Sequence, residues 1–112
     1  MTEEKICSFM GLAVKARQAV SGSFMSDKAI KMGTAKLVLV AKDASENTKK
    51  GFRDAGKFYN ATIRELGSKE LLGKYSGKDS RTAIAITSES FANKLLSMID
   101  ELEQNHGGAG IE

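Results

Sequence analysis

Residues 37–41 read Leu-Val-Leu-Val-Ala, and residues 43–48 read Asp-Ala-Ser-Glu-Asn-Thr. The first run is apolar throughout and rich in β-branched side chains, which predicts a strand buried on both faces, as in a helix-covered sheet. The second run is typical of a turn whose side chains cap a helix, here one that continues through Lys57. Such a joint leaves amide donors at the carboxyl edge of the sheet, where α/β folds commonly bind ligands. The same joint also occurs where it only connects two elements of the fold.

Apolar residues elsewhere recur at helical or strand spacing, so helices and strands are expected to alternate along the chain. Thr2, Ser68 and Ser88 stand where each can cap a following helix. Helices are expected after Thr2, over residues 24–32, 46–57 and 69–75, and after Ser88, and strands over residues 18–22, 37–41, 62–66 and 83–87. This order predicts a three-layer α/β/α sandwich with a four-stranded, mixed and largely parallel sheet. We expect one domain over residues 1–103 and a flexible tail over residues 104–112.

The composition is that of an ordinary water-soluble domain, with 112 residues, 41% hydrophobic and 28% charged. A net charge of +3 and a pI of about 9.0 are compatible with an anionic partner, although many housekeeping proteins are equally basic. Cys7 is the only cysteine, which excludes an internal disulfide and fits a reducing compartment. The sequence shows neither a signal peptide nor a membrane-spanning stretch, so we expect a cytoplasmic protein without membrane contact.

Residues with catalytic or metal-binding chemistry are few and scattered. Cys7 lies in an apolar stretch typical of a buried structural thiol, and His106 is a lone histidine in the predicted tail. Neither supplies a metal cluster, and no glycine-rich phosphate loop of a standard kind is present. Acid–base work by Asp43 or Glu46 would need a pocket, and Asp43 is more simply a turn or cap residue. We therefore expect no enzymatic activity, no metal and no cofactor.

Three polar turns are expected to gather at one end of the sheet, at residues 21–23, 43–47 and 76–82. Backbone amides and hydroxyls in such turns can approach phosphates closely, and Lys or Arg can grip a phosphate or a guanine edge. The few aromatic residues are mostly expected in the core, so no platform for stacking single-stranded bases is indicated. A structured RNA recognised by its shape is the ligand that fits best. Cations near the three turns are Lys28, Lys49, Lys69 and Arg81.

A basic stripe follows the helix expected over residues 46–57. Lys49, Lys50, Arg53 and Lys57 recur there at intervals of three or four residues. A solvated helix face is the ordinary explanation of such a stripe.

The order of several short motifs resembles the kink-turn RNA-binding family of ribosomal proteins, the L-seven-Ae and L-thirty-e superfamily. In chain order these motifs are Ser21-Gly22, Lys28-Ala29-Ile30, Gly33, residues 35–43 and Leu72-Gly73. Residues 9–13 and 43–50 look closest to its small bacterial YlxQ-like subgroup. Together the motifs span residues 6–96. The resemblance implies an α/β/α sandwich without enzymatic activity that binds RNA kink-turns, such as those of ribosomal RNA.

The resemblance also implies which residues meet the RNA. In the family, a turn and the helix after it enter the bent RNA with the pattern Gly, a small residue, Asn, Glu and, further on, Lys. Gly22, Ser23 and Lys28 match this pattern, whereas Phe24 and Met25 stand where Asn and Glu are expected. Because Asn and Glu read the sheared G·A pairs of a kink-turn, the departure bears directly on kink-turn recognition.

Three further segments contribute contacts in the family. They correspond here to the start of the third helix, Ser45 to Lys49, to Lys69 at the start of the next helix, and to a last loop over residues 78–82. Arg81 matches the basic member of that loop, while the apolar loop residues of archaeal relatives are missing.

The expected function is that of a ribosome-associated protein that binds structured, kink-turn-like RNA through one basic face. Ribosomal RNA is the first expected partner, ribosomal proteins are further candidates, and a monomer is expected. The alternative is a protein-interaction module on the same fold, with Phe24 and Met25 as an apolar contact patch. The residues expected on the RNA-binding face are Gly22, Ser23, Lys28, Ser45, Lys49, Lys69, Lys78 and Arg81.

Overall fold

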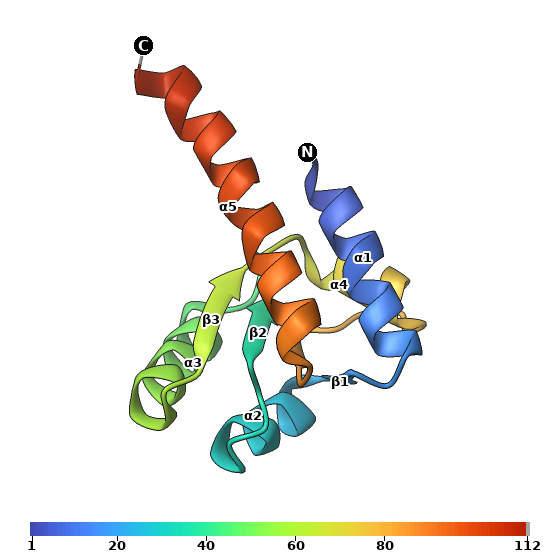
Figure 1. The fold of residues 1–112 in the computed structure, drawn as a ribbon. Helices are drawn as coiled ribbons and strands as arrows, with labels where there is room; N and C mark the ends of the chain where they lie inside the picture. Colours follow the sequence, from blue (N-terminus) through green and yellow to red (C-terminus); the bar gives the residue numbers. More distant parts are fainter. Residues whose placement is uncertain (112) are drawn as a thin grey trace.

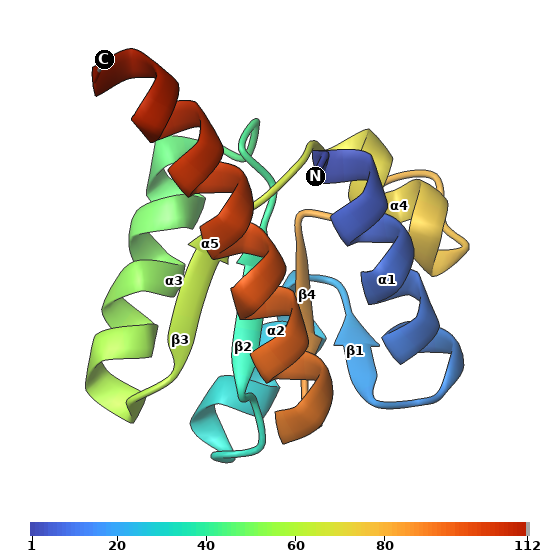
Figure 2. The ribbon, with the colours of Figure 1, turned by 45° about the horizontal axis from the view of Figure 1, so that its top comes forward.

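The computed structural model describes residues 1–111, and the side chains of residues 1–104. In this described part, four strands form one sheet in the order β1-β4-β2-β3. Figure 1 shows the fold, and Figure 2 shows the four strands side by side. The strands are β1 (Ala19–Ser21), β2 (Leu37–Val40), β3 (Thr62–Glu65) and β4 (Ala83–Ile86). Strand β4 runs antiparallel to both of its neighbours, while β2 and β3 are parallel. The sheet is therefore mixed, as predicted. Three strands point the same way, but two of the three pairings are antiparallel because the reversed strand lies inside the sheet.

The reversal of β4 decides where the loops lie. Ser21 of β1 pairs with Ile84, and Val40 of β2 pairs with Ala83 on one side and Glu65 of β3 on the other. The start of β4 thus lies at the same end of the sheet as the last residues of the other three strands. The loop that enters β4 therefore meets the loops that leave β1, β2 and β3 at one end of the sheet.

Within residues 1–111, five helices cover the two faces of the sheet, which confirms the three-layer sandwich. Leu37 and Leu39 of β2 face a core built with α1, α4 and α5, while Val38 and Val40 face a second core built with α2 and α3. This alternation explains why the whole strand is apolar. Figure 2 shows α5 crossing in front of the sheet with α2 behind it. The helices are α1 (Glu3–Lys15), α2 (Ser23–Lys31), α3 (Glu46–Tyr59), α4 (Lys69–Ser76) and α5 (Glu89–Ile111).

Most predicted caps are confirmed by hydrogen bonds. The side chains of Thr2, Ser45 and Ser68 accept from the backbone N–H three residues on, at 3.2, 3.1 and 3.0 Å. Helix α2 begins at Ser23, one residue before the helix expected over residues 24–32, and its N-cap is Gly22, which has no side chain to form a capping bond. The φ of Gly22 is 101°, a conformation that a side chain would strain.

Helix α5 continues to Ile111, through the stretch from Gln104 that the sequence predicts as a tail. Leu102 is the last buried core residue of the described side chains. Helix bounds do not test motion, so the flexible tail stays a prediction, and Glu112 and the side chain of His106 lie outside the described part. Within residues 1–111, no helix has both the length and the apolar character that crossing a bilayer requires.

Candidate nucleic-acid interface

The loops at the end of the sheet are joined to one another by backbone hydrogen bonds. The N–H of Gly22 donates to the carbonyl of Ala83 at 2.8 Å, and the N–H of Ala41 donates to the carbonyl of Thr82 at 2.9 Å. The N–H of Lys42 donates to the carbonyl of Gly67, also at 2.9 Å. We call this region, formed by residues 21–23, 41–49, 66–69 and 78–82, the strand-end surface. It contains the turns expected at residues 21–23 and 43–47, residues 78–82 of the turn expected at residues 76–82, and the loop after β3 in addition.

Arg81 is held against the turn at Gly22. Its Nε donates to the Oγ of Ser21 at 2.7 Å, and its Nη1 donates to the carbonyl of Ser80 at 3.1 Å. A Cβ built on Gly22 would lie 3.8 Å from the Nε of Arg81, so the turn and the guanidinium are in direct proximity. These two bonds use two of the five N–H groups of the guanidinium. The protein thus orients Arg81 while leaving donors that can reach a phosphate or a base edge.

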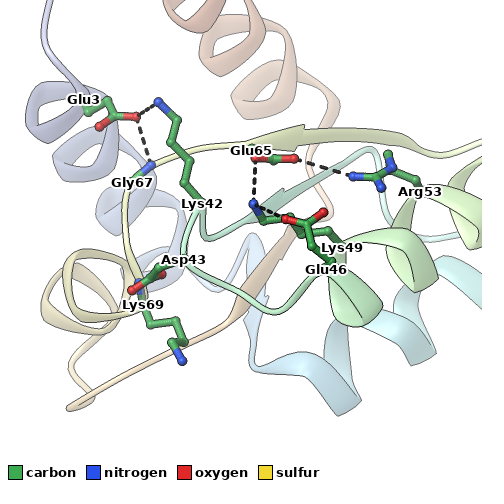
Figure 3. Close-up of polar contacts among 9 residues, drawn as sticks. All are labelled: Glu3, Lys42, Asp43, Glu46, Lys49, Arg53, Glu65, Gly67 and Lys69. Carbon is green, nitrogen blue, oxygen red and sulfur yellow. Dashed lines mark hydrogen bonds and ion pairs between the residues drawn. The ribbon is translucent and has the colours of Figure 1, made fainter.

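Lys69 is fixed through its backbone. Its N–H donates to Oδ1 of Asp43 at 2.8 Å, and its carbonyl accepts from the N–H of Arg81 at 2.9 Å. The side chain extends away from the other residues drawn in Figure 3. Asp43 and the Ser68 cap occupy amides of the first turn of α4, which agrees with the simpler reading of Asp43 as a cap residue. Lys69 therefore offers a cation at the strand-end surface, next to Arg81.

Lys49 occupies a different environment. Its ammonium lies 3.5 Å from a carboxylate oxygen of Glu46 and 3.4 Å from one of Glu65, and only 12% of its side chain is exposed. Arg53 lies 3.6 Å from the same Glu65, so one carboxylate joins two cations (Figure 3). The structure thus places the charge of Lys49 between α3 and β3, where carboxylates already neutralise it.

Ser23 and Ser45 lie on the α2–α3 side of the strand-end surface. Ser23 lines a hollow of about 250 Å³ with Asp27, Thr48, Gly51 and Phe52. The Oγ of Ser45 donates to Oγ1 of Thr48 at 2.9 Å, so hydroxyls from both helix starts border this hollow. These hydroxyls can accept or donate to a phosphate or a ribose.

Lys28 and Lys78 lie on opposite flanks. Lys28 is exposed on α2, four residues after Phe24 and therefore on the same side of the helix. Lys78 lines a hollow of about 490 Å³ on the side of α1 and α4, which carboxylates including Glu4 and Glu70 also line. Among residues 1–104, none of the ion pairs includes Lys28, Lys69, Lys78 or Arg81. The structure thus brings Gly22, Lys69 and Arg81 together, and sets Lys28 and Lys78 at the margins.

Two residues hold the strand-end surface together through hydrogen bonds to distant residues that the sequence did not predict. Ser21, which accepts from Arg81, is 60 residues away from it in the chain, and Asp43 accepts from a residue 26 positions later. A serine or an aspartate in a turn was the only available signal, and it does not name a distant partner. Phe24 is 78% exposed and Met25 40% exposed, so both lie open to solvent beside Gly22.

The described residues bear on two of the chemistries considered from the sequence, a reactive thiol and a metal cluster. Burial raises the pKa of the Cys7 thiol to about 12, with Glu3 and Glu4 adding to the shift, so the thiol stays protonated. Within the described residues, His, Cys, Asp and Glu form no group of three or more that could hold a metal ion. The cations, hydroxyls and backbone amides of the strand-end surface are groups that can bind an anionic ligand.

Comparisons with known proteins agree with this architecture. The family model described as the ribosomal protein L7Ae/L30e/S12e/Gadd45 family matches residues 4–96. The RNA-binding protein YlxQ of Bacillus subtilis is 42% identical over 91 residues, covering 81% of this chain and 91% of the relative. The protein of the same name from Enterococcus faecium is 34% identical over 97 residues, covering 87% and 93%.

Solved structures share the fold. A protein of unknown function from Bacillus halodurans superposes with a TM-score of 0.81 at 34% identity, covering 86% of this chain and 97% of that one. The 15.5kD RNA binding protein of Giardia lamblia gives 0.70 at 18% identity, covering 89% and 85%. The chain therefore belongs to the ribosomal protein L7Ae/L30e/S12e/Gadd45 family and, within it, to the YlxQ-like subgroup.

Proposed function

We propose that this protein binds structured RNA through the strand-end surface. The observation that carries the proposal is the placement of Lys69 and Arg81 beside Gly22, at a sheet end where backbone and hydroxyl donors also gather. Lys69 contacts a phosphate, Arg81 contacts a phosphate or a base edge, and Gly22 lets the backbone approach closely. Relatives at 42% and 34% identity are named RNA-binding proteins, which supports RNA as the anion.

A kink-turn is the class of RNA that we propose, with ribosomal RNA as its natural source. Membership of a ribosomal protein family supports this choice. Phe24 and Met25 lack the polar groups that the family pattern places at these two positions. Binding here therefore depends on phosphate contacts and on the bent shape more than on base edges. Such binding weakens steeply as salt concentration rises, because phosphate contacts release counterions.

Titration of a labelled kink-turn duplex and of an unkinked duplex of the same length tests the proposal. We expect tighter binding to the kink-turn, with an affinity that falls steeply with salt for both RNAs. Equal affinity for the two duplexes would support RNA binding and contradict kink-turn recognition. Absence of binding to either duplex at low salt would contradict the proposed function.

A second function is favoured by the exposure of Phe24 and Met25 at the start of α2. An exposed aromatic beside an exposed methionine suits a protein partner on the same fold. Under this alternative, Phe24→Ser abolishes association with a purified ribosomal protein partner and leaves RNA affinity unchanged. Under the first proposal, RNA affinity depends on Lys69 and Arg81 whether or not such a partner is found.

A further inference from the structure

A groove of about 320 Å³ lies between α3 and the edge strand β3. Its lining includes Arg53, Lys57, Thr62 and Arg64, and none of its lining residues is acidic. We call it the α3–β3 groove. It lies outside the strand-end surface, and it brings together cations from two separate elements of the fold.

The convergence of these cations follows from the packing of α3 on β3. Arg53 and Lys57 are four residues apart and therefore lie on the same side of the helix. Arg64 comes from β3, which pairs only with β2 and so has a free outer edge. A Cβ on Gly56 would lie 2.8 Å from the carbonyl oxygen of Ala61, so glycine allows the helix to lie directly against the start of the strand. Ile63 packs toward α3, so Arg64, the next residue of the strand, leaves β3 on the other face of the sheet and adds a third cation to the lining of the groove.

The groove keeps a positive charge. Arg53 lies 3.6 Å from Glu65, and the nearby Asp54, whose pKa is lowered by its bond from Lys50 and also by the charges of Lys57 and Arg53, pairs with Lys50 at 2.7 Å. Lys57 and Arg64 take part in none of the ion pairs among residues 1–104. The Nη1 of Arg64 donates to the carbonyl of Ile63 at 3.3 Å, which steadies its guanidinium at the strand edge. A helix face that is merely exposed to solvent would explain Arg53 and Lys57. It would not explain the third cation of the groove, Arg64, which comes from β3.

The groove is continuous with the strand-end surface. Glu65, the last residue of β3, joins Lys49 at the start of α3 to Arg53 at the groove (Figure 3). Lys57 lies one helical turn beyond Arg53, a step of about 6 Å along the axis. A polyanion that leaves the strand-end surface along α3 therefore meets Arg53 first and Lys57 next.

We propose that the α3–β3 groove is a second phosphate-binding site, which takes the backbone of a helical stem of the same RNA. The inference rests on the proposed function, because the strand-end surface holds the bend from which that stem extends. Lys57 and Arg64 contact phosphates, and the hydroxyl of Thr62 can donate to one. Contacts of this kind position a duplex without reading its sequence.

Lysine footprinting tests the second site on the unmodified protein. The protein is acetylated briefly with a water-soluble reagent under three conditions. It is free, bound to a kink-turn duplex with long stems, or bound to a kink-turn duplex whose stems are trimmed to the base pairs that flank the bend. We expect the long-stem RNA to protect both Lys57 and Lys69, and the trimmed RNA to protect Lys69 alone. Lys94, exposed on α5 on the opposite face of the sheet, is the internal control and stays reactive in every case. Equal reactivity of Lys57 with and without the long-stem RNA would overturn the inference.

Two variants provide an independent measurement. We expect Lys57→Ala and Arg64→Ala each to weaken long-stem binding severalfold and to lower the salt slope by about 1, with no effect on the trimmed RNA. Lys94→Ala is the matched control and should resemble wild type. If Lys57→Ala and Arg64→Ala match wild type while Lys69→Ala is weakened, the second site is wrong and the proposed function stands. If wild type binds neither RNA, both proposals fail together.

Discussion

The Nε of Arg81 lies 2.7 Å from the Oγ of Ser21 and donates a hydrogen bond to it. The two residues flank the paired ends of β1 and β4, so this bond fixes the guanidinium at the strand-end surface. We expect Arg81→Ala to weaken RNA binding about tenfold, equivalent to about 1.4 kcal/mol. Ser21→Ala keeps the charge and removes only the positioning bond, so its loss should be smaller. Duplex titration measures both, and a loss for Ser21→Ala that exceeds that for Arg81→Ala would contradict this assignment.

Lys69 and Lys49 both lie near the strand-end surface, but of these two ammonium groups only that of Lys49 is paired with carboxylates in the structure. Lys69→Ala should weaken binding and lower the slope of log affinity against log salt by about 1, because one phosphate contact is lost. Lys49→Ala should change RNA affinity less, because Glu46 and Glu65 already neutralise that ammonium. It should instead lower the free energy of unfolding by about 1 kcal/mol, since Glu65 loses one of its two cations. Salt titrations and urea unfolding separate the two effects, and equal salt slopes for both variants would count against the distinction.

Asp43 joins the β2–α3 loop to α4 by accepting from the N–H of Lys69 at 2.8 Å. Asp43→Ala leaves that amide without its acceptor, and we expect the free energy of unfolding to fall by about 1 kcal/mol. RNA affinity should not fall, because the variant removes a negative charge beside Lys69. Urea unfolding and duplex titration on the same preparation check both parts. A variant with unchanged stability and weaker RNA binding would assign Asp43 to the ligand instead of the fold.

The carboxylate of Glu4 links α1 to α4. A hydrogen bond from the hydroxyl of Tyr75 at 2.7 Å and the ammonium of Lys74 at 3.2 Å lower the pKa of Glu4 from its ordinary value of 4.5. A lowered pKa contributes stability that is complete above 4.5 and is lost as pH falls through the lowered value. We therefore expect Glu4→Gln to be less stable than wild type at neutral pH, and the difference to narrow below pH 4.5. A difference that stays constant with pH would show that the charge of Glu4 contributes nothing.

The local elements of this fold could be predicted from the sequence because their causes are local. The apolar run over residues 37–41 is buried on both faces, as its composition indicates. Thr2, Ser45 and Ser68 form caps because a serine or threonine hydroxyl reaches an amide three residues on. The family could be recognised because several short motifs kept their order and spacing.

The arrangement of the sheet and the partners of the charged residues could not be predicted in the same way. The position and direction of β4 depend on pairing with strands more than 40 residues away in sequence. Arg81 donates a hydrogen bond to Ser21, which lies 60 residues away in the sequence. Lys49 forms an ion pair with Glu65 only because α3 packs on β3. Charge alone made Lys49 and Lys69 look equivalent, and only their neighbours distinguish them. The site residues therefore remain predictions until RNA is bound.

Photo-crosslinking of the wild-type protein to a kink-turn duplex, followed by mass spectrometry of the crosslinked peptides, tests the central claim most directly. We expect crosslinks in the peptides that carry Gly22 and Ser23 and in those that carry Lys69 and Arg81. Crosslinks confined to the outer faces of α1 and α5, with none at the strand-end surface, would contradict it.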